Sequence, residues 1–175
     1  MQLLQVFDTN ADCLTDAGFN TFILPYLAAL PKLVKAQLAA LPTPLACPPM
    51  TVFAKGIHAP SQLLALASCG YSTVGIDWGI TPRAARLATQ GKVALQGNLD
   101  PPVLHAGRDA IRREVRELVW GKDGFFTCAA EGLGGGWIVN LGHGITPGVD
   151  PDDLKFFLER VRAETSKKTA DELEQ

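Results

Sequence analysis

The sequence lacks any clustered run of lysine and arginine. Its 16 Lys and Arg residues are outnumbered by 18 Asp and Glu residues, and its formal net charge at pH 7 is −2. A nucleic-acid-binding face needs clustered positive charge, because it must neutralise backbone phosphates. We therefore expect no nucleic-acid partner.

Signals for a membrane or an export pathway are scarce as well. No apolar run approaches the roughly eighteen residues of a membrane span, and the first residues show no basic segment with a cleavage site. We expect no membrane partner and a cytoplasmic location. A plastid is the alternative location if a longer parent chain carries a transit peptide.

Cysteine occurs at only four positions, which are far apart: Cys13, Cys47, Cys69 and Cys128. None of them has the C-x-x-C or C-x-H spacing of a zinc site, and their separation does not resemble a disulfide framework. We expect free thiols in a reducing compartment and no bound metal.

The loops that bind nucleotide phosphates are missing too. Neither G-x-G-x-x-G nor G-x-x-x-x-G-K occurs in the chain. The glycine-rich segment 132–136 precedes a predicted strand, whereas a phosphate-binding turn follows a strand and opens a helix. The sequence therefore contains no signal for a nucleotide phosphate site.

What the chain has instead is a set of short apolar segments that alternate with helix-like segments. The apolar segments predict strands at residues 3–7, 50–54, 73–76, 93–95 and 137–141. Helices are predicted within 19–40, with breaks at Pro25 and Pro31, and at 61–68 with Ser61 as the cap, 83–89, 108–120 and from 150 onward. This alternation is typical of parallel βαβ units in a single α/β domain of 175 residues.

Two architectures are compatible with five such units. They complete an open, doubly wound sheet of the flavodoxin type, or they supply part of a (β/α)8 barrel. Both architectures place their ligand at the carboxyl ends of the strands. One connection, residues 121–136, is longer than an ordinary helix-to-strand loop. It is either an inserted loop or a gene-model error, and we expect it to expose Phe125 and Phe126, which favours association.

Polar side chains follow the carboxyl ends of the predicted strands. If all strands are parallel, these side chains gather on one face: Asp8, Thr9, Lys55, Asp77, Gln96, Asn98, Asp100 and His143. Taken singly, each also fits a turn, cap or surface role. His143 lies between two glycines that allow a sharp turn, so it is placed for chemistry or binding, or it is a turn histidine hydrogen-bonded to its own loop.

The motifs at these strand ends carry a resemblance to a known family. In chain order they are Leu-Leu-Gln-Val-Phe-Asp-Thr (3–9), Pro-Met-Thr-Val-Phe-Ala-Lys-Gly (49–56), Val-Gly-Ile-Asp-Trp (74–78), Leu-Gln-Gly-Asn-Leu-Asp-Pro (95–101) and Asn-Leu-Gly-His-Gly (140–144). Their order and approximate spacing resemble the C-terminal part of the uroporphyrinogen decarboxylase family over residues 1–162. Residues 163–175 then form a polar tail, and we expect the chain to fray from Thr165 onward.

The resemblance implies a (β/α)8 TIM barrel, incomplete because this chain supplies about five βα units, barrel strands 4 to 8. It implies conversion of uroporphyrinogen III to coproporphyrinogen III in haem and chlorophyll synthesis, by removal of four acetate carboxyl groups without metal or organic cofactor. It also implies a homodimer. Three residues match substrate-binding positions of the family: His143 in the pocket, Thr9 after the fourth strand and Phe7 on the pocket wall.

No catalytic residue is assignable in this chain by the same comparison. The family's Arg-Gln-Ala-Gly-Arg segment, the aspartate that binds the pyrrole NH groups and the tyrosine of the third strand have no match here. All three would lie upstream of Met1 in the family.

Two further interpretations stay open. The chain is a non-catalytic fragment or pseudo-enzyme that associates through open barrel edges, because five strands cannot close an eight-stranded barrel. Alternatively, it belongs to the zinc- and corrinoid-linked methyltransferase branch related to this family. That branch requires His and Cys ligands at strand ends, whereas Cys69 and Cys128 are predicted at a helix end and in a loop.

Overall fold

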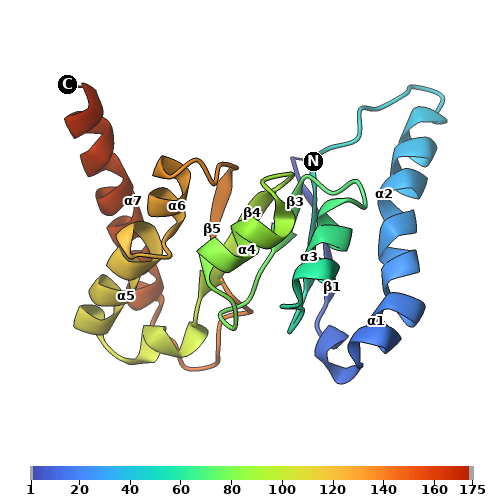
Figure 1. The fold of residues 1–175 in the computed structure, drawn as a ribbon. Helices are drawn as coiled ribbons and strands as arrows, with labels where there is room; N and C mark the ends of the chain where they lie inside the picture. Colours follow the sequence, from blue (N-terminus) through green and yellow to red (C-terminus); the bar gives the residue numbers. More distant parts are fainter. Residues whose placement is uncertain (1, 174–175) are drawn as a thin grey trace.

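Five parallel strands alternate with helices along the chain (Figure 1). The computed structural model describes the backbone of residues 2–173 and the side chains of residues 2–166. The strands are β1 (Leu4–Asp8), β2 (Met50–Ala54), β3 (Thr73–Gly75), β4 (Ala94–Leu99) and β5 (Trp137–Leu141). The helices are α1 (Asp16–Phe22), α2 (Leu24–Ala39), α3 (Pro60–Ala67), α4 (Pro82–Thr89), α5 (Arg108–Trp120), α6 (Phe125–Ala130) and α7 (Pro151–Leu173), with short 3-10 turns η1 (Ala11–Cys13) and η2 (Pro101–His105).

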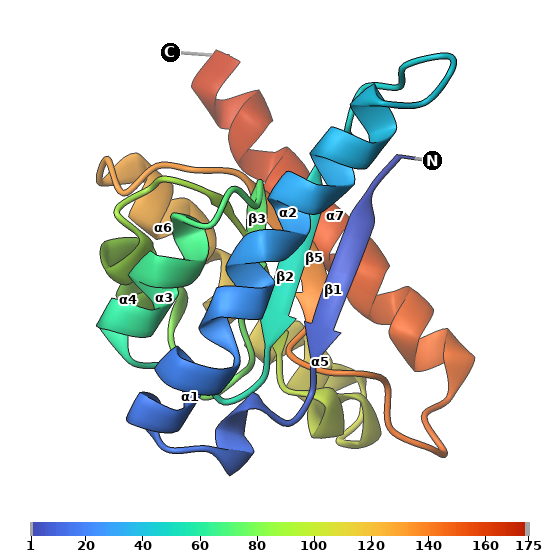
Figure 2. The same ribbon diagram turned by 90° about the vertical axis from the view of Figure 1, so that its right-hand side faces the viewer.

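The strand order in the sheet is the order in the chain. Each strand pairs in parallel with the next one, from β1 through β5. The arrowheads of β1, β2 and β5 accordingly point the same way in Figure 2. A flavodoxin-type sheet reverses its order at a switch point, as 2-1-3-4-5. The uninterrupted order excludes that alternative and confirms the predicted partial barrel.

The outer face of the sheet packs against the helices. Because side chains alternate across a strand, Val52, Val74 and Leu95 share this face and are buried in one cluster with Leu63 and Leu66 of α3. A second cluster joins α5 and α7 to the carboxyl ends of β4 and β5. The apolar strand residues are thus explained by burial under the helical layer.

The inner face of the sheet is concave. Gln96 on β4 donates from Nε2 to Oε1 of Gln5 on β1 at 3.3 Å, although β2 and β3 lie between these strands. Two strands at such a separation meet only if the sheet curls towards barrel geometry. Among the described residues β1 and β5 each pair on one side only, so they form the two open edges.

Strand β4 is longer than predicted. The sequence predicts residues 93–95, whereas the strand runs through Leu99 and includes Gln96 and Asn98. These two polar residues are buried because Gln96 has a polar partner on β1 and Asn98 has two carbonyl partners in the loop after β3. A strand whose polar residues face a barrel interior does not give the apolar pattern of a buried strand, and the prediction is wrong for that reason.

Helix α2 contains a proline without breaking. The predicted break at Pro25 is confirmed, since Pro25 lies at the start of α2, but Pro31 lies inside the helix. A proline removes the N–H that would serve the carbonyl four residues earlier, which is that of Leu27. The Tyr71 hydroxyl donates to this carbonyl at 2.8 Å. The buried tyrosine replaces the missing donor, so the helix continues.

The long connection before β5 is partly helical and packed. It contains α6, and Phe125 at the start of this helix is 1% exposed. The Phe125 ring stacks on Trp137 of β5, with centroids 4.5 Å apart and an interplanar angle of 14°. The expectation of an exposed Phe125 is therefore wrong, because the connection folds back onto the sheet and buries the ring.

Strand β5 has the predicted bounds but is not fully buried. Ile138 is 38% exposed, since β5 is an edge strand and its inner face meets no opposing strand among the described residues.

Two helix ends also differ from prediction. Helix α3 begins at Pro60 with Ala59 as N-cap, so Ser61 is not its cap. Helix α7 runs through Leu173 in place of the frayed chain expected after Thr165, and the proposed boundary at residue 162 stays a prediction.

The outer helices α1 and α2 form an unusually apolar segment. By length and composition alone, Asp16–Ala39 is sufficient to cross a membrane, and an 18-residue window within it has a mean hydropathy of 1.2. The expectation that no run approaches that length is wrong for this segment. In the fold, Phe19 and Leu27 pack it against the core, with Thr15 capping α1 through a hydrogen bond from the Gly18 N–H.

Candidate functional site

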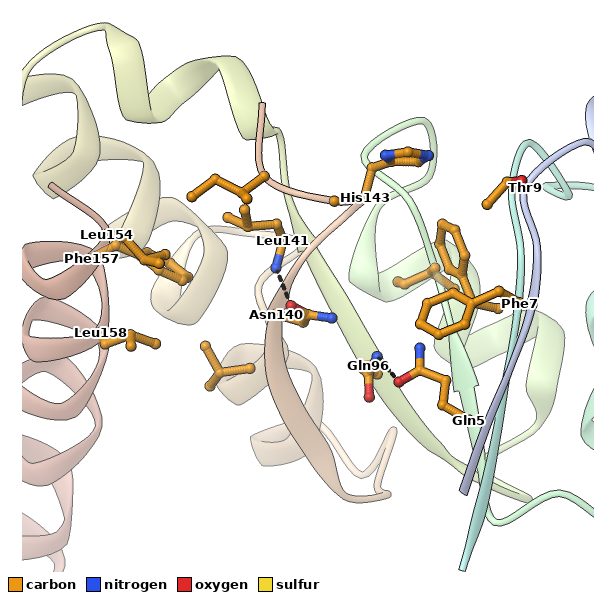
Figure 3. Close-up of a pocket in the computed structure, with 15 residues that line it drawn as sticks. Gln5, Phe7, Thr9, Gln96, Asn140, Leu141, His143, Leu154, Phe157 and Leu158 are labelled. Carbon is orange, nitrogen blue, oxygen red and sulfur yellow. Dashed lines mark hydrogen bonds between the residues drawn. The ribbon is translucent and has the colours of Figure 1, made fainter. Parts of the chain in front are cut away.

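A cavity of about 510 Å³ opens at the carboxyl ends of the strands. Its walls come from β1, β2, β4, β5, the segment after β5 and the first turns of α7 (Figure 3). Phe7, Thr9 and His143, the three residues singled out by resemblance, all line it. The parallel arrangement explains this, because it brings the loops that follow different strands to one end of the barrel.

One wall of the cavity is aromatic. Phe7 and Phe53 are register partners on β1 and β2, and their rings meet edge to face with centroids 6.3 Å apart. Phe7 is 65% exposed, so much of its ring faces open space. A large exposed ring beside a cavity is suited to contact with a flat apolar ligand surface.

His143 lies between two aromatic rings. Its imidazole centroid is 6.1 Å from that of Phe53 and 6.4 Å from that of Trp78, both in edge-to-face geometry. Gly142 makes this approach possible, because a Cβ there would lie 2.7 Å from the Trp78 backbone nitrogen. Within the described part of the chain the His143 ring makes no hydrogen bond, so the alternative of a turn histidine bonded to its own loop finds no support.

The segment after His143 is attached to the other side of the mouth. His105 Nε2 lies 2.8 Å from the Thr146 hydroxyl, which joins η2 to the loop after β5. Thr9 is exposed in the loop after β1. Thr9 follows the edge strand β1 and His143 follows the other edge strand, β5, so these two predicted substrate-binding residues lie at opposite edges of the half-barrel.

Amide side chains line the inner part of the cavity. Figure 3 shows Gln5 and Gln96 joined by their hydrogen bond, with Asn140 on the neighbouring strand. The Asn140 Oδ1 accepts from the Leu141 N–H at 2.9 Å, which leaves the Asn140 NH₂ group as a donor towards the cavity. Sequence reasoning placed Gln96 at this end but missed Gln5, Asn140 and Phe53.

Asp8 and Lys55 have ordinary local roles. The Asp8 carboxylate accepts from the Asn10 N–H at 3.2 Å, as a turn residue does. Lys55 Nζ lies 3.0 Å from Asp12 Oδ2 at the surface. This contact lowers the pKa of Asp12 and raises the pKa of Lys55. Neither residue lines the cavity.

Asp77 and Asn98 hold loops together at the mouth. Asp77 is 6% exposed, and its carboxylate lies 2.6 Å from His58 Nε2. Asn98 Nδ2 donates to the Asp77 and Ile80 carbonyls at 2.8 and 2.7 Å. Asp77 therefore bridges two neighbouring loops, and Asn98 ties β4 to the loop after β3. His58, which sequence reasoning missed, is part of the same network.

Asp100 is partly buried without a partner for one oxygen. Its Oδ1 has no hydrogen bond from any described group, and burial raises the pKa of its carboxyl. It lies outside the cavity that His143 lines. Among the side chains of residues 2–166, no three His, Cys, Asp or Glu side chains lie together in an arrangement that could hold a metal ion.

Comparison with known proteins assigns the chain to a family. The family model described as "Uroporphyrinogen decarboxylase (URO-D)" matches residues 1–164. The chain belongs to the uroporphyrinogen decarboxylase family. Uroporphyrinogen decarboxylases of Danio rerio, Schizosaccharomyces pombe and Homo sapiens are 41%, 40% and 39% identical to it, each over 91% of this chain.

These uroporphyrinogen decarboxylases are much longer than the chain. The matched region covers 40% of the Danio rerio and Homo sapiens proteins and 41% of the Schizosaccharomyces pombe protein. A methyltransferase from Methanosarcina mazei has the same fold, with a TM-score of 0.70 and 16% sequence identity over 94% of this chain and 42% of that chain. The chain thus spans about two fifths of its relatives.

Proposed function

We propose that this chain contributes the C-terminal part of an enzyme that converts uroporphyrinogen III to coproporphyrinogen III. The observation that carries the proposal is the gathering of Phe7, Thr9 and His143 around one cavity, in a chain of the uroporphyrinogen decarboxylase family. The uroporphyrinogen decarboxylase relatives support the same reaction by name.

The reaction has a simple balance at each of the four acetate groups. Protonation of a pyrrole ring makes the ring an electron sink, and the bond between the acetate CH₂ and its carboxyl carbon breaks to release CO₂. The electron pair neutralises the protonated ring and leaves an exocyclic CH₂ group. A proton then adds to this CH₂ to complete the methyl group, and the ring loses the proton it gained at the start, so each acetate consumes one proton and releases one CO₂. We assign Phe7 and Phe53 to contact with the ring faces, and Thr9 and His143 to polar groups of the substrate.

The charge of the substrate defines what another part of the enzyme must add. Uroporphyrinogen carries eight carboxylates, and guanidinium groups are the side chains best suited to binding them in pairs of hydrogen bonds. No Lys or Arg lines this cavity among the described residues. We therefore propose that turnover requires an N-terminal part that supplies arginines, and the carboxylate that stabilises the protonated pyrrole.

The test is an assay of the chain with and without the N-terminal part of a relative, such as the Danio rerio protein. Coproporphyrinogen is measured by fluorescence of the oxidised product. We expect turnover only in the combined sample, and a loss of about tenfold or more for His143→Ala. Leu87→Ala, on the exposed side of α4, is the matched control and leaves turnover unchanged. Absence of turnover when both parts are folded and bound overturns the proposal.

A second candidate function follows from the open edges of the sheet. β1 and β5 each present unpaired backbone groups, and Phe7 and Ile138 expose apolar surface beside them. Such edges favour association. In this case the chain is a non-catalytic member of the family that forms a homodimer. Gel filtration then shows the same homodimer whether or not an N-terminal part is added.

A further inference from the structure

The mouth of the cavity contains a network that resemblance and strand pattern do not assign to the site. It centres on the Asp77 carboxylate, which follows β3 and is almost completely buried. Asp77 Oδ2 accepts from the Gly56 N–H at 2.6 Å, and Oδ1 accepts from the Gly79 N–H at 2.7 Å. His58 Nε2 lies 2.6 Å from the same Oδ1.

This network joins two loops. Gly56 and His58 belong to the loop between β2 and α3, whereas Asp77 and Gly79 belong to the loop between β3 and α4. The contact is close, because a Cβ on Gly79 would lie 2.3 Å from His58 Cε1. The second loop is also held from behind by the Asn98 amide. This loop therefore has hydrogen bonds both to the neighbouring loop and to β4.

Each joined loop is next to a ring that touches His143. Phe53 lies on β2 three residues before Gly56, and Trp78 directly follows Asp77. Phe53 and Trp78 are the two rings in edge-to-face contact with the His143 imidazole. The distance between the two loops therefore decides the width of the slot in which the imidazole lies.

The backbone around His143 depends on the same loop. Gly142 packs against the Asp77–Trp78 peptide so closely that a Cβ there would lie 3.1 Å from the Asp77 carbonyl carbon and 3.0 Å from Trp78 Cε3. The Gly142 N–H donates a hydrogen bond to the Leu99 carbonyl at 2.7 Å. A displacement of Trp78 therefore moves the neighbour against which the His143 turn is packed.

We propose that Asp77 and His58 are positioning residues for His143, and that they act through Trp78. Neither side chain lines the cavity, so their effect on a bound ligand is indirect. Three donors converge on one carboxylate, which is an arrangement that a neutral amide cannot reproduce, because its NH₂ group would face a backbone N–H. The effect of Asp77 and His58 on ligand binding rests on the proposed function, whereas their effect on the position of the His143 ring does not.

The test uses the 175-residue chain and the NMR signals of the His143 ring, which the nearby Phe53 and Trp78 rings shift. The His143 signals are identified by their loss in His143→Gln. We expect them to move in His58→Ala and in Asp77→Asn. They return to the original positions in His58→Gln, because the glutamine amide can donate from nearly the same point as His58 Nε2.

A control variant separates this effect from a general disturbance of the mouth. Asp153→Asn breaks the Arg108–Asp153 ion pair, which joins the starts of α5 and α7 at this end of the sheet but touches neither Trp78 nor His143. It leaves the His143 signals in place. A purely structural role for Asp77 predicts lower stability with unchanged His143 signals in all folded variants, and that result overturns the proposal.

The route through Trp78 is tested separately, which also covers the case in which Asp77→Asn fails to fold. Trp78 is 45% exposed, so Trp78→Leu removes a ring that is not part of the core. We expect the His143 signals to move in Trp78→Leu and to move no further when His58→Ala is added. Additive shifts in the double variant overturn the route.

Binding of uroporphyrin, the stable oxidised form of the substrate class, is the second readout. The binding is measured with the chain combined with the N-terminal part of a relative, and we expect it to be about tenfold weaker for His58→Ala than for the original chain, with recovery in His58→Gln. If the original chain in this combined sample binds no uroporphyrin, the proposed function fails while the NMR comparison still decides the positioning role. If it binds and His58→Ala binds equally well with moved His143 signals, positioning of His143 has no role in binding.

Discussion

At the scale of single residues, the structure shows how polar groups are satisfied where the backbone pattern leaves them without a partner. The Leu27 carbonyl lacks its helical donor because Pro31 has no N–H, and the Tyr71 hydroxyl donates to it from the β3 side. This bond explains why an otherwise forbidden proline is tolerated in α2. It also explains why Tyr71 is buried in the apolar cluster.

Tyr71→Phe removes that donor. We expect the free energy of unfolding to fall by about 1–2 kcal/mol, because a buried carbonyl is left unsatisfied. In a Pro31→Ala background the helix supplies its own N–H at this position, so the same substitution has a smaller effect. Urea unfolding of the four proteins measures the coupling. Strictly additive losses contradict the interpretation.

Asp100→Asn tests the effect of a buried carboxyl group on stability. Burial raises the pKa of Asp100 in the folded state above the ordinary 3.8, so its protonated form is favoured by folding. The resulting stability is present below pH 3.8 and is lost as pH rises through the raised pKa. We expect Asp100→Asn to increase the free energy of unfolding at pH 7, and the gain to shrink as pH falls towards 3.8.

The control for this comparison is Asp109→Asn, at a side chain that is 97% exposed on α5. It is expected to change stability by less than about 0.5 kcal/mol at either pH. A gain from Asp100→Asn that does not depend on pH would show that the charge is not its cause.

At the scale of elements, the packing of α6 shows that the connection before β5 is part of the core. Phe125 stacks on Trp137, and the guanidinium of Arg86 lies 5.7 Å from the centre of the Phe125 ring. Arg86 also donates to the Gly136 carbonyl at 2.9 Å. The element therefore ties α4, α6 and the start of β5 together.

Phe125→Ala should weaken this part of the fold. We expect a loss of about 3–5 kcal/mol in the free energy of unfolding, as for other buried phenylalanines, together with a change in tryptophan fluorescence as Trp137 loses its stacked ring. Phe22→Ala is the matched control, because Phe22 is 68% exposed on α1. Equal effects of the two substitutions in thermal unfolding would rule out a packed role for α6.

The elements that could be predicted from the sequence are those whose burial follows local periodicity. Strand β2 and the helix α5 have the predicted bounds, because each shows its burial pattern in its own residues. Strand β4 and helix α6 could not be predicted in full. Gln96 is buried by a partner on another strand and Asn98 by carbonyls of the loop after β3, and α6 is stabilised by Trp137, which lies outside it.

The candidate site also has features that the sequence predicts and features that it does not. The positions of Thr9 and His143 at one mouth follow from parallel strands, which the sequence predicts. The contacts of His143 with Phe53 and Trp78, and of Asp77 with His58, depend on how closely two loops approach. That distance results from the curvature of the sheet, and no local pattern encodes it.

At the scale of the whole molecule, the open edges should control association. We expect concentration-dependent self-association of the chain in sedimentation velocity. Ile138→Lys should reduce it, because a charge on the inner face of the edge strand β5 opposes pairing. Leu87→Lys adds the same charge on the outside of α4 and should leave association unchanged. If the chain is monomeric at every concentration, the edge strands β1 and β5 do not mediate self-association.

The sequential strand order has a consequence for how the fold is reached. Every ladder in the sheet joins neighbours along the chain, so each strand finds its partner as soon as the next unit has been synthesised. Closure of a barrel is different, because it joins the first and last units over a long stretch of polypeptide and carries a large loop entropy. The five-unit segment can therefore assemble early, and ring closure is the late and separable event.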